Sequence, residues 1–202
     1  MNSEDHTVLI VDDDCRVREG LSELLSAVGF HSTAFASIAE YVQFPRPDVP
    51  SCLILDVKLP DMDGLEFQAR NAGMSQPPIV FITGFGDIRM SVSALKGGAV
   101  DFLTKPLRTA ELIAAIRTAI VRDRHERQAR AERASLERRL AQLTPRERDV
   151  MPLIVQGMLN KQVAAALGIS EVTLQIHRRR VMQKMRASSL ADLVRMSVTL
   201  GL

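Results

Sequence analysis

Residues 52–64 read CLILDVKLPDMDG: a short apolar run ends at Asp56 and is followed by a loop that contains Pro60 and Gly64. A short apolar run bounded by turn residues is typical of a strand buried on both faces of a sheet. Together with four comparable runs, one of them weaker, it forms a set at residues 7–11, 31–35, 52–55, 79–83 and 100–103. Amphipathic stretches lie between and after them at residues 16–28, 37–44, 65–71, 88–96 and 108–120. This alternation predicts an α/β fold, a doubly wound, parallel, five-stranded sheet with helices on both faces.

Polar side chains stand where these apolar runs end. Asp12 and Asp13 follow the first run, Asp56 ends the run at 52–55, Thr83 ends the run at 79–83, and Lys105 follows the last. The carboxyl ends of parallel strands meet at one edge of the sheet, where such folds bind their ligands. We therefore expect three carboxylates, a hydroxyl and an amine to converge there.

Clustered carboxylates repel one another unless a cation neutralises them. Oxygen ligands of this kind suit Mg²⁺, which often bridges carboxylates and phosphate. A lysine and a threonine beside the cluster could hold phosphoryl oxygens through charge and hydrogen bonding. The strand ends therefore indicate a Mg²⁺-dependent site for a phosphoryl group.

Four motifs in this order, Asp12-Asp13, LDVKLPDMDG, FITGFGD and DFLTKP, resemble the receiver domain of two-component response regulators. The resemblance covers about residues 5–120 and implies a flavodoxin-like fold. It implies that Asp56 is the phosphoacceptor, which takes its phosphoryl group from a phosphohistidine of a sensor histidine kinase. It also implies that Asp12, Asp13, Asp56 and the backbone carbonyl of Lys58 bind Mg²⁺.

The same resemblance gives roles to residues near the last strands. Lys105 would hold the phosphoryl group, Thr83 would shift toward it, and Phe102 would follow as a switch residue by turning inward. Pro106 occupies the position where a cis peptide bond is usual. Leu107 stands where an aromatic residue is common, so the packing beneath the fifth helix is open to question.

Charge divides the chain unequally although the net charge of its 202 residues is only +2. Residues 1–120 hold 10 lysines and arginines against 16 acidic residues, and residues 121–202 hold 16 against 8. This split favours an N-terminal half that binds cations and a C-terminal half that binds a polyanion. Two ordinary solvated surfaces would also fit these charges.

Targeting and redox signals point to the cytoplasm. No apolar segment approaches about 18 residues, so we expect no membrane span. The acidic start MNSEDHTVLIVDDD lacks the basic and apolar regions of a signal peptide. Cys15 and Cys52 have no metal-ligand spacing, and we interpret Cys15 as the start of a helix rather than a redox site.

Residues 121–142 lack glycine and proline and are rich in Arg, Glu and Ala, which predicts a helical linker. An all-α domain of four helices then follows at residues 143–202. Thr144, Pro145 and Glu147 form a helix-start signature. Gly168-Ile169-Ser170 separates the second and third helices by the short glycine turn of a helix-turn-helix.

The third helix, from Ser170 to about Arg186, has two different faces when drawn at 100° per residue. Leu174, Val181 and Met185 share an inward face, with His177 and Arg178 at its borders. We expect His177 to be a border residue whose hydrogen bonds are satisfied, because no partner residue suggests a metal. The outward face carries amides, arginines and aliphatic side chains that suit the edges of bases in a major groove; they are Val172, Gln175, Ile176, Arg179 and Gln183. An ordinary charged surface is the alternative.

The stretches LTPRERDV, GMLNKQVAAALGIS and VTLQIHRRRVMQKM resemble the C-terminal domain of LuxR/NarL/FixJ transcription regulators. By motif position, Gln175, Ile176 and Arg179 would read bases. The resemblance implies phosphate contacts for Lys161, Thr173 and Lys184, and a dimer surface on the fourth helix. Pro152 departs from a regular helix and is expected to kink the first helix of this domain.

Together these features predict a response regulator of the FixJ/NarL/LuxR family rather than an enzyme: a transcription factor, taken as an activator, that is switched by phosphorylation. The resemblance implies homodimers on phosphorylation, double-stranded DNA with an inverted repeat, and RNA polymerase as partners. A haloacid-dehalogenase-like phosphatase would need a second carboxylate two residues after Asp56, where Lys58 stands. A module that binds only protein is a further alternative, which heparin retention that collapses with salt would exclude.

Overall fold

The computed structural model of the chain describes residues 6–46, 48–73 and 75–202. The expected receiver start at residue 5 and part of the acidic N-terminal stretch lie outside these ranges. The chain forms two compact units, residues 1–127 and 128–202, each with its own core. Within the described ranges, the helices include none that is long and apolar enough to cross a membrane.

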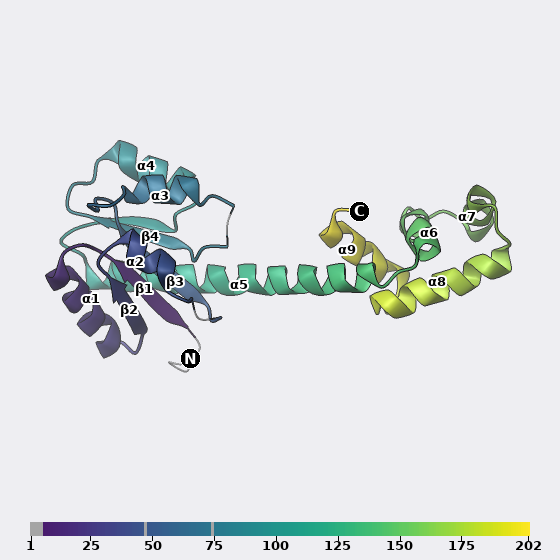
Figure 1. Cartoon of the computed structure of the whole chain (residues 1–202), viewed down its shortest axis with the longest axis horizontal. Coiled ribbons are helices and arrows are strands. Elements are labelled where there is room, and N and C mark those ends of the chain that lie inside the picture. The colour runs from purple at the N-terminus through teal and green to yellow at the C-terminus, as the bar shows by residue number, and fades with distance from the viewer. Residues whose placement is uncertain (1–5, 47, 74) are drawn as a thin grey trace. The chain divides into compact units, whose positions relative to one another are not determined.

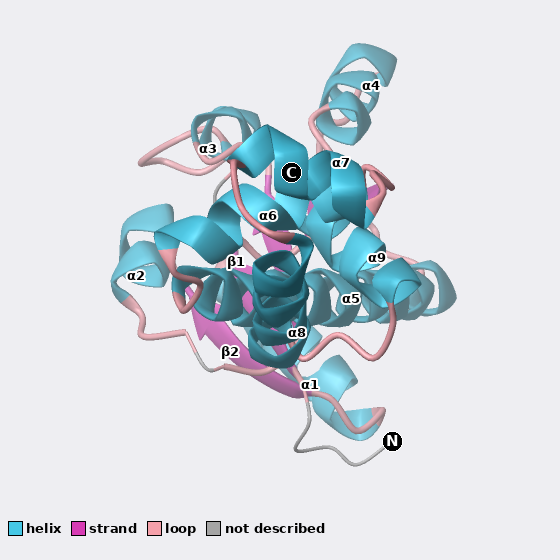
Figure 2. Cartoon of the chain, turned by 90° about the vertical axis from the view of Figure 1, so that its right-hand side faces the viewer, coloured by secondary structure: helices cyan, strands magenta, loops and turns pink. Residues whose placement is uncertain are grey.

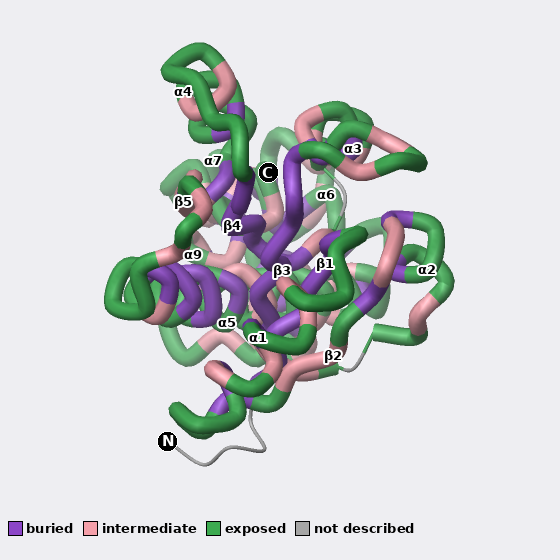
Figure 3. Tube along the Cα trace, turned by 90° about the vertical axis from the view of Figure 1, so that its left-hand side faces the viewer, coloured by how far each residue is buried: buried purple, intermediate pink, exposed green. Residues whose placement is uncertain are grey.

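The N-terminal unit is built on a parallel sheet in the order β2-β1-β3-β4-β5 (Figure 1). Its strands are β1 (Thr7–Val11), β2 (His31–Phe35), β3 (Ser51–Asp56), β4 (Ile79–Thr83) and β5 (Asp101–Thr104). Every residue of β1, β3 and β4 is buried, as the colours of Figure 3 show. The continuous apolar runs of the sequence therefore mark strands that are covered on both faces.

Helices cover the two faces of this sheet and give it two cores. Leu21 and Leu25 of α1 (Cys15–Ala27) and Ile116 of α5 (Thr109–Ala141) pack in one core. The other core receives side chains from three helices, α2 (Ile38–Gln43), α3 (Gly64–Arg70) and α4 (Ile88–Lys96). This is the doubly wound α/β architecture predicted from the sequence. Leu107 packs against the first core, so an aromatic residue is not needed there.

Helix α5 continues through the predicted linker and ends at Ala141. In the first unit, polar contacts of α5 beyond Ile120 fasten the helix to the start of β3. The buried carboxylate of Asp123 accepts a hydrogen bond from the Ser51 N–H at 2.8 Å. Arg127 binds Asp123 at 2.7 Å and Asp48 at 2.6 Å. The part of α5 up to residue 127 is thus fastened to the sheet by contacts that the sequence pattern did not reveal.

The C-terminal unit is helical apart from its turns, as the colouring of Figure 2 shows. It contains the end of α5 followed by α6 (Pro145–Val155), α7 (Asn160–Leu167), α8 (Glu171–Met185) and α9 (Leu190–Leu200). The Thr144–Glu147 capping box starts α6 as predicted. Gly168 ends α7 with φ +65°, a left-handed conformation that glycine adopts without steric cost. Leu174, Val181 and Met185 are buried, which confirms the inward face of α8.

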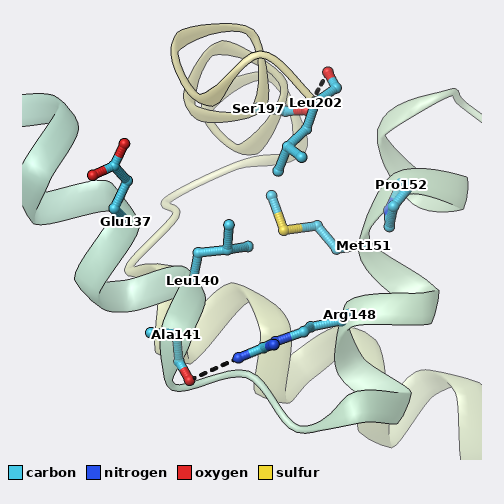
Figure 4. A pocket seen from close by; sticks show the side chains of 8 residues that line it. All are labelled: Glu137, Leu140, Ala141, Arg148, Met151, Pro152, Ser197 and Leu202. Carbon is cyan, nitrogen blue, oxygen red and sulfur yellow. Dashed lines mark hydrogen bonds between the residues drawn. The ribbon is translucent and has the colours of Figure 1, made fainter.

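Helix α6 continues through Pro152 to Val155 despite the missing backbone donor. Pro152 is exposed and lines an apolar pocket of about 370 Å³ with Leu140, Met151 and Leu202 (Figure 4). At the edge of this pocket, Arg148 donates a hydrogen bond to the carbonyl of Ala141 at 3.1 Å. The proline therefore sits where its ring meets open space, and the helix does not end there.

Candidate functional site

Lys105 lies at the centre of the acidic cluster that the topology assembles. Its Nζ donates to Asp12 Oδ2 at 2.7 Å and to Asp56 Oδ2 at 2.8 Å. Asp12 and Asp56 are buried at the ends of neighbouring strands, β1 and β3, and Lys105 follows β5. The Lys105–Pro106 peptide bond is cis, as expected. The amine thus bridges two carboxylates that come from distant parts of the sequence.

The carboxylates form a group that fits a divalent cation. Asp12, Asp13 and Asp56 each offer an oxygen, and these oxygens lie within 4.8 Å of one another. Hard oxygen donors of this number and charge suit Mg²⁺, which completes its coordination with water. The N–H of Lys58 donates to Asp56 Oδ1 at 3.2 Å, which orients the carboxylate. The backbone carbonyl of Lys58 as a fourth ligand stays a prediction.

Burial and charge act against each other at this site. Burial raises the pKa of Asp12 above its ordinary value, and the hydrogen bond from Lys105 opposes this only in part. Burial alone would lower the pKa of Lys105, but its bonds to Asp12 and Asp56 raise it instead. Lys105 is therefore held as a cation at neutral pH, ready to pair with negatively charged oxygens.

Two further residues support the acidic cluster. The sequence carries no sign of the role of Arg18, and Gly64 stood out only as part of a motif. Arg18 of α1 donates to the backbone carbonyl of Asp12 at 2.7 Å, a contact that no motif signalled. Gly64 packs under Asp56: a Cβ atom there would lie 2.6 Å from the carbonyl oxygen of Asp56. Glycine is needed because the loop after β3 passes so close to the backbone of Asp56.

The predicted switch residues lie along β4 and β5. Thr83 is buried at the end of β4 and its Oγ1 accepts a hydrogen bond from the Phe85 N–H at 3.2 Å. Phe102 is half-buried on β5. Gly86 separates them: a Cβ atom there would lie 2.9 Å from the Phe102 ring and 3.1 Å from Thr83 Cγ2. The absent side chain of Gly86 leaves room for both residues.

A cation–π pair joins the loops that follow β3 and β4. The Lys58 ammonium lies 5.3 Å from the centre of the Phe85 ring. Phe85 is 79% exposed, so the aromatic face stands in solvent rather than in the core. These two residues follow Asp56 and Thr83 by two positions each, and their pairing adds an apolar edge to a polar site.

The outward face of α8 carries the predicted base readers. Gln175, Ile176 and Arg179 are exposed, as are the neighbouring Val172 and Gln183. Ile176 is 49% exposed, although an aliphatic side chain gains by burial. The structure therefore presents on one helix face the amide, aliphatic and guanidinium groups that suit base edges.

The three predicted phosphate contacts differ in their surroundings. Lys161 is exposed near the start of α7. Thr173 lies in the first turn of α8, where its N–H and hydroxyl bond Ser170 Oγ. Lys184 instead donates at 2.6 Å to Glu147, whose side chain is 1% exposed. Burial alone would raise the pKa of Glu147, but Lys184 and the capping N–H of Thr144 hold it below its ordinary value. Lys184 thus has a structural partner, and its DNA contact stays a prediction.

The border residues of α8 correct one expectation. Arg178 donates to Asn160 Oδ1 at 2.7 Å and so ties α8 to the start of α7. His177 was expected to be a satisfied border residue, but its buried Nδ1 has no hydrogen-bond partner among the described residues. The expectation was wrong because the position of a residue on the helical wheel predicts how far its ring is buried. It does not predict whether another polar group lies within hydrogen-bond distance of that ring.

Two family models match this chain, one for each unit. Residues 8–117 match the model of the response regulator receiver domain, and residues 141–197 match that of bacterial regulatory proteins of the luxR family. Together the two models cover most of the chain. They agree with the acidic cluster of the sheet and with the helix-turn-helix of α7 and α8.

Relatives and solved structures match nearly the whole length. The chain is 51% identical to Nodulation protein W of Bradyrhizobium diazoefficiens, over 96% of this chain and 86% of that protein. It is 40% identical to Transcriptional regulatory protein FixJ of Rhizobium meliloti, over 98% and 97%. The structure of response regulator StyR matches 96% of this chain and 98% of its own, with 42% identity and a TM-score of 0.83. The chain therefore belongs to the two-component response regulators that join a receiver domain to a luxR-family DNA-binding domain.

Proposed function

We propose that phosphorylation of Asp56 by a sensor histidine kinase switches sequence-specific DNA binding by α8. The observation that carries the proposal is the bridge from Lys105 Nζ to Asp12 Oδ2 and Asp56 Oδ2 at 2.7 and 2.8 Å. Asp56 is held by the Lys105 ammonium and lies beside the carboxylates of Asp12 and Asp13. Once Asp56 carries a phosphoryl group, the Lys105 ammonium can pair with the oxygens of that group. Mg²⁺, when bound by Asp12, Asp13 and Asp56, would neutralise the charge on the transferring phosphoryl group.

The transfer needs one nucleophile and one leaving group. An oxygen of Asp56 attacks the phosphorus of the kinase phosphohistidine, the P–N bond breaks, and its electron pair returns to the imidazole. Lys105 keeps its proton and pairs with a phosphoryl oxygen, since its pKa is raised. The Lys58 N–H continues to orient the carboxyl group through its bond to Oδ1. The product is an acyl phosphate on the receiver.

The response spreads through β4 and β5. Thr83 moves toward the phosphoryl group, and Phe102, whose ring lies against Gly86, turns inward after it. This reshapes the surface of α4, β5 and α5, where Ile88 of α4 is 82% exposed. Receivers pair through that surface, and the pair presents two DNA-binding units to an inverted repeat. The dimer acts in the cytoplasm as an activator that engages RNA polymerase.

The DNA-binding role divides contacts by chemistry. Arg179 and Gln175 read base edges by hydrogen bonds, and Ile176 packs against a thymine methyl group. Lys161 and Thr173 bind phosphates at the start of α7 and of α8. Lys184 can add a phosphate contact only from the part of its ammonium that faces solvent, since Glu147 holds it.

The phosphoacceptor role is tested by labelling the full chain. With Mg²⁺ and acetyl phosphate, intact mass should show one phosphoryl group on the wild type and none on Asp56→Asn. Asp48→Asn is the matched control, because Asp48 is an exposed carboxylate near the opposite end of β3 and should be labelled as wild type. Label that persists in Asp56→Asn, or that survives EDTA undiminished, contradicts the proposal.

A further inference from the structure

A basic pocket of about 510 Å³ flanks the C-terminal end of the recognition helix α8. Arg180, Gln183, Lys184 and Arg186 line it from α8 and its cap, and Glu147 lines it from α6. Its volume suits a small polar group and its bound solvent. None of the base readers Gln175, Ile176 and Arg179 belongs to this lining, so the pocket borders the outward face of α8, through Gln183, without containing them.

The charges of this pocket do not cancel. Glu147 is its one lining carboxylate, and that carboxylate already accepts from Lys184 at 2.6 Å and from the Thr144 N–H at 2.8 Å. Arg180 and Arg186 are exposed, and within the described residues no hydrogen bond or ion pair engages their guanidinium groups. Two arginines therefore remain to attract an anion, and each can bind phosphate oxygens in a bidentate way.

The backbone of Arg186 is an outlier that calls for an explanation. It caps α8 with φ +57°, in the left-handed region, and within the described ranges it is the one non-glycine residue with positive φ. Gly168 and Gly201 fill the equivalent positions after α7 and α9. An L-residue there is strained, and strained residues concentrate where a side chain has a function. A guanidinium group is thus kept where glycine would fit better.

The position of Arg180 on the helix tells which surface of DNA it would meet. At 100° per residue, Arg180 lies about 90° from the centre of the face formed by Gln175, Ile176 and Arg179. When that face points into a major groove, a side chain 90° away points toward the groove wall. The wall is formed by phosphates, which are bound mainly for affinity and orientation rather than for sequence.

We propose that Arg180 and Arg186 bind phosphates of the DNA backbone in this pocket. The proposal rests on the proposed DNA-binding function and adds a second class of contact beside the base readers. Lys184 lines the same pocket but is already paired with Glu147 at 2.6 Å. The arginine pair supplies charge without reading bases, so its contribution is the same on every sequence.

The test uses Arg186→Gly in the full chain, because fold stability and DNA binding should then change in opposite directions. Glycine relieves the left-handed strain, so the melting temperature of the DNA-binding unit should rise by roughly 2–4 °C. Fluorescence anisotropy should show weaker binding by a similar factor on a selected duplex and on its scrambled version. The slope of log affinity against log salt should fall by about one, and by about two in Arg180→Gln/Arg186→Gly.

Arg70→Gln is the matched control, since Arg70 is an exposed arginine of the receiver unit and should leave affinity and salt slope unchanged. Unchanged DNA affinity and slope in Arg186→Gly would overturn the proposal and leave Arg186 as a helix cap alone. A loss confined to the selected duplex would also overturn it, because that pattern belongs to a base reader. Inorganic phosphate at matched ionic strength could instead compete with DNA for the wild type but not for Arg186→Gly. That result would overturn the proposal and assign the pocket to free anions. A wild type that fails to prefer the selected duplex contradicts the proposed function instead.

Discussion

The acidic cluster of the receiver and the outward face of α8 are built on opposite plans. In the acidic cluster, Lys105 bonds both Asp12 and Asp56 at 2.7–2.8 Å, and the two carboxylates are buried. On α8, Gln175 and Arg179 are exposed, and their side chains have no hydrogen-bond partner among the described residues. One site is complete before its ligand arrives, and the other offers free groups to a ligand.

The difference teaches what each site should do when altered. A residue that holds partners within the fold will change stability when it is replaced, whereas a residue that faces solvent will change binding alone. Lys184 is the informative exception, because motif position makes it a DNA contact while its bond to Glu147 makes it part of the fold. Its replacement therefore tests the comparison most severely.

Lys184→Met should destabilise the DNA-binding unit, because it leaves the buried Glu147 carboxylate without its cation. Breaking such a pair costs about 3 kcal/mol. Chemical denaturation should show the loss in this unit, with the receiver transition unchanged. Lys161→Met is the control and should leave stability as in wild type. Equal stability of Lys184→Met and wild type would mean that Lys184 serves DNA alone.

Arg179→Ala should keep wild-type stability and lose binding. The loss on a selected duplex should be about 1–3 kcal/mol, with relaxed preference at one base position. Isotherms on selected and scrambled duplexes across a salt series separate the two kinds of contact. An equal loss on both duplexes would make Arg179 a phosphate contact and would require a different rotation of α8 in the groove.

Phe85→Ala should shorten the lifetime of the phosphorylated state. We expect the exposed Phe85 ring, paired with Lys58 at 5.3 Å, to hinder water that approaches the phosphorus in line. Loss of phosphoryl label over time should be several-fold faster than in wild type, an effect below about 1.4 kcal/mol. Phe85→Tyr retains the bulk and should decay as wild type. An unchanged rate in Phe85→Ala would contradict the steric account.

Acid should weaken the DNA-binding unit through Glu147. Its pKa lies below its ordinary value of 4.5, so its contribution to stability is present above pH 4.5 and is lost as pH falls through the lower folded value. Glu147→Gln should therefore be less stable than wild type at pH 7, with the gap closing below pH 4.5. Asp149→Asn, on an exposed carboxylate of the same helix, is the control. A gap that stays constant with pH would mean that charge is not what Glu147 contributes.

The sequence alone predicted the elements of the sheet because their signals are local. The start and end of β1, β2, β4 and α4 coincide with the predicted ranges, since each apolar run is bounded by turn or polar residues. The convergence of Asp12, Asp56 and Lys105 followed from topology, because parallel strands bring their carboxyl ends to one edge. The exposed face of α8 followed from helical periodicity.

Contacts between distant polar residues could not be predicted in this way. Asp123 bonds the Ser51 N–H across 72 positions, and Lys184 bonds Glu147 across 37. Neither pair leaves a periodic trace, because a single polar contact depends on how two elements pack. The left-handed cap at Arg186 was missed for a related reason: its conformation is usual for glycine, and an arginine gives no local sign of it.

DNA binding before and after phosphorylation tests the central claim most directly. Anisotropy isotherms on a selected inverted-repeat duplex would compare wild type with Asp56→Asn, each with Mg²⁺ and with or without acetyl phosphate. The account predicts that acetyl phosphate tightens binding of the wild type, leaves Asp56→Asn unchanged, and loses its effect in EDTA. Equal tightening of both proteins, or none in a wild type shown by mass to carry the phosphoryl group, would contradict it.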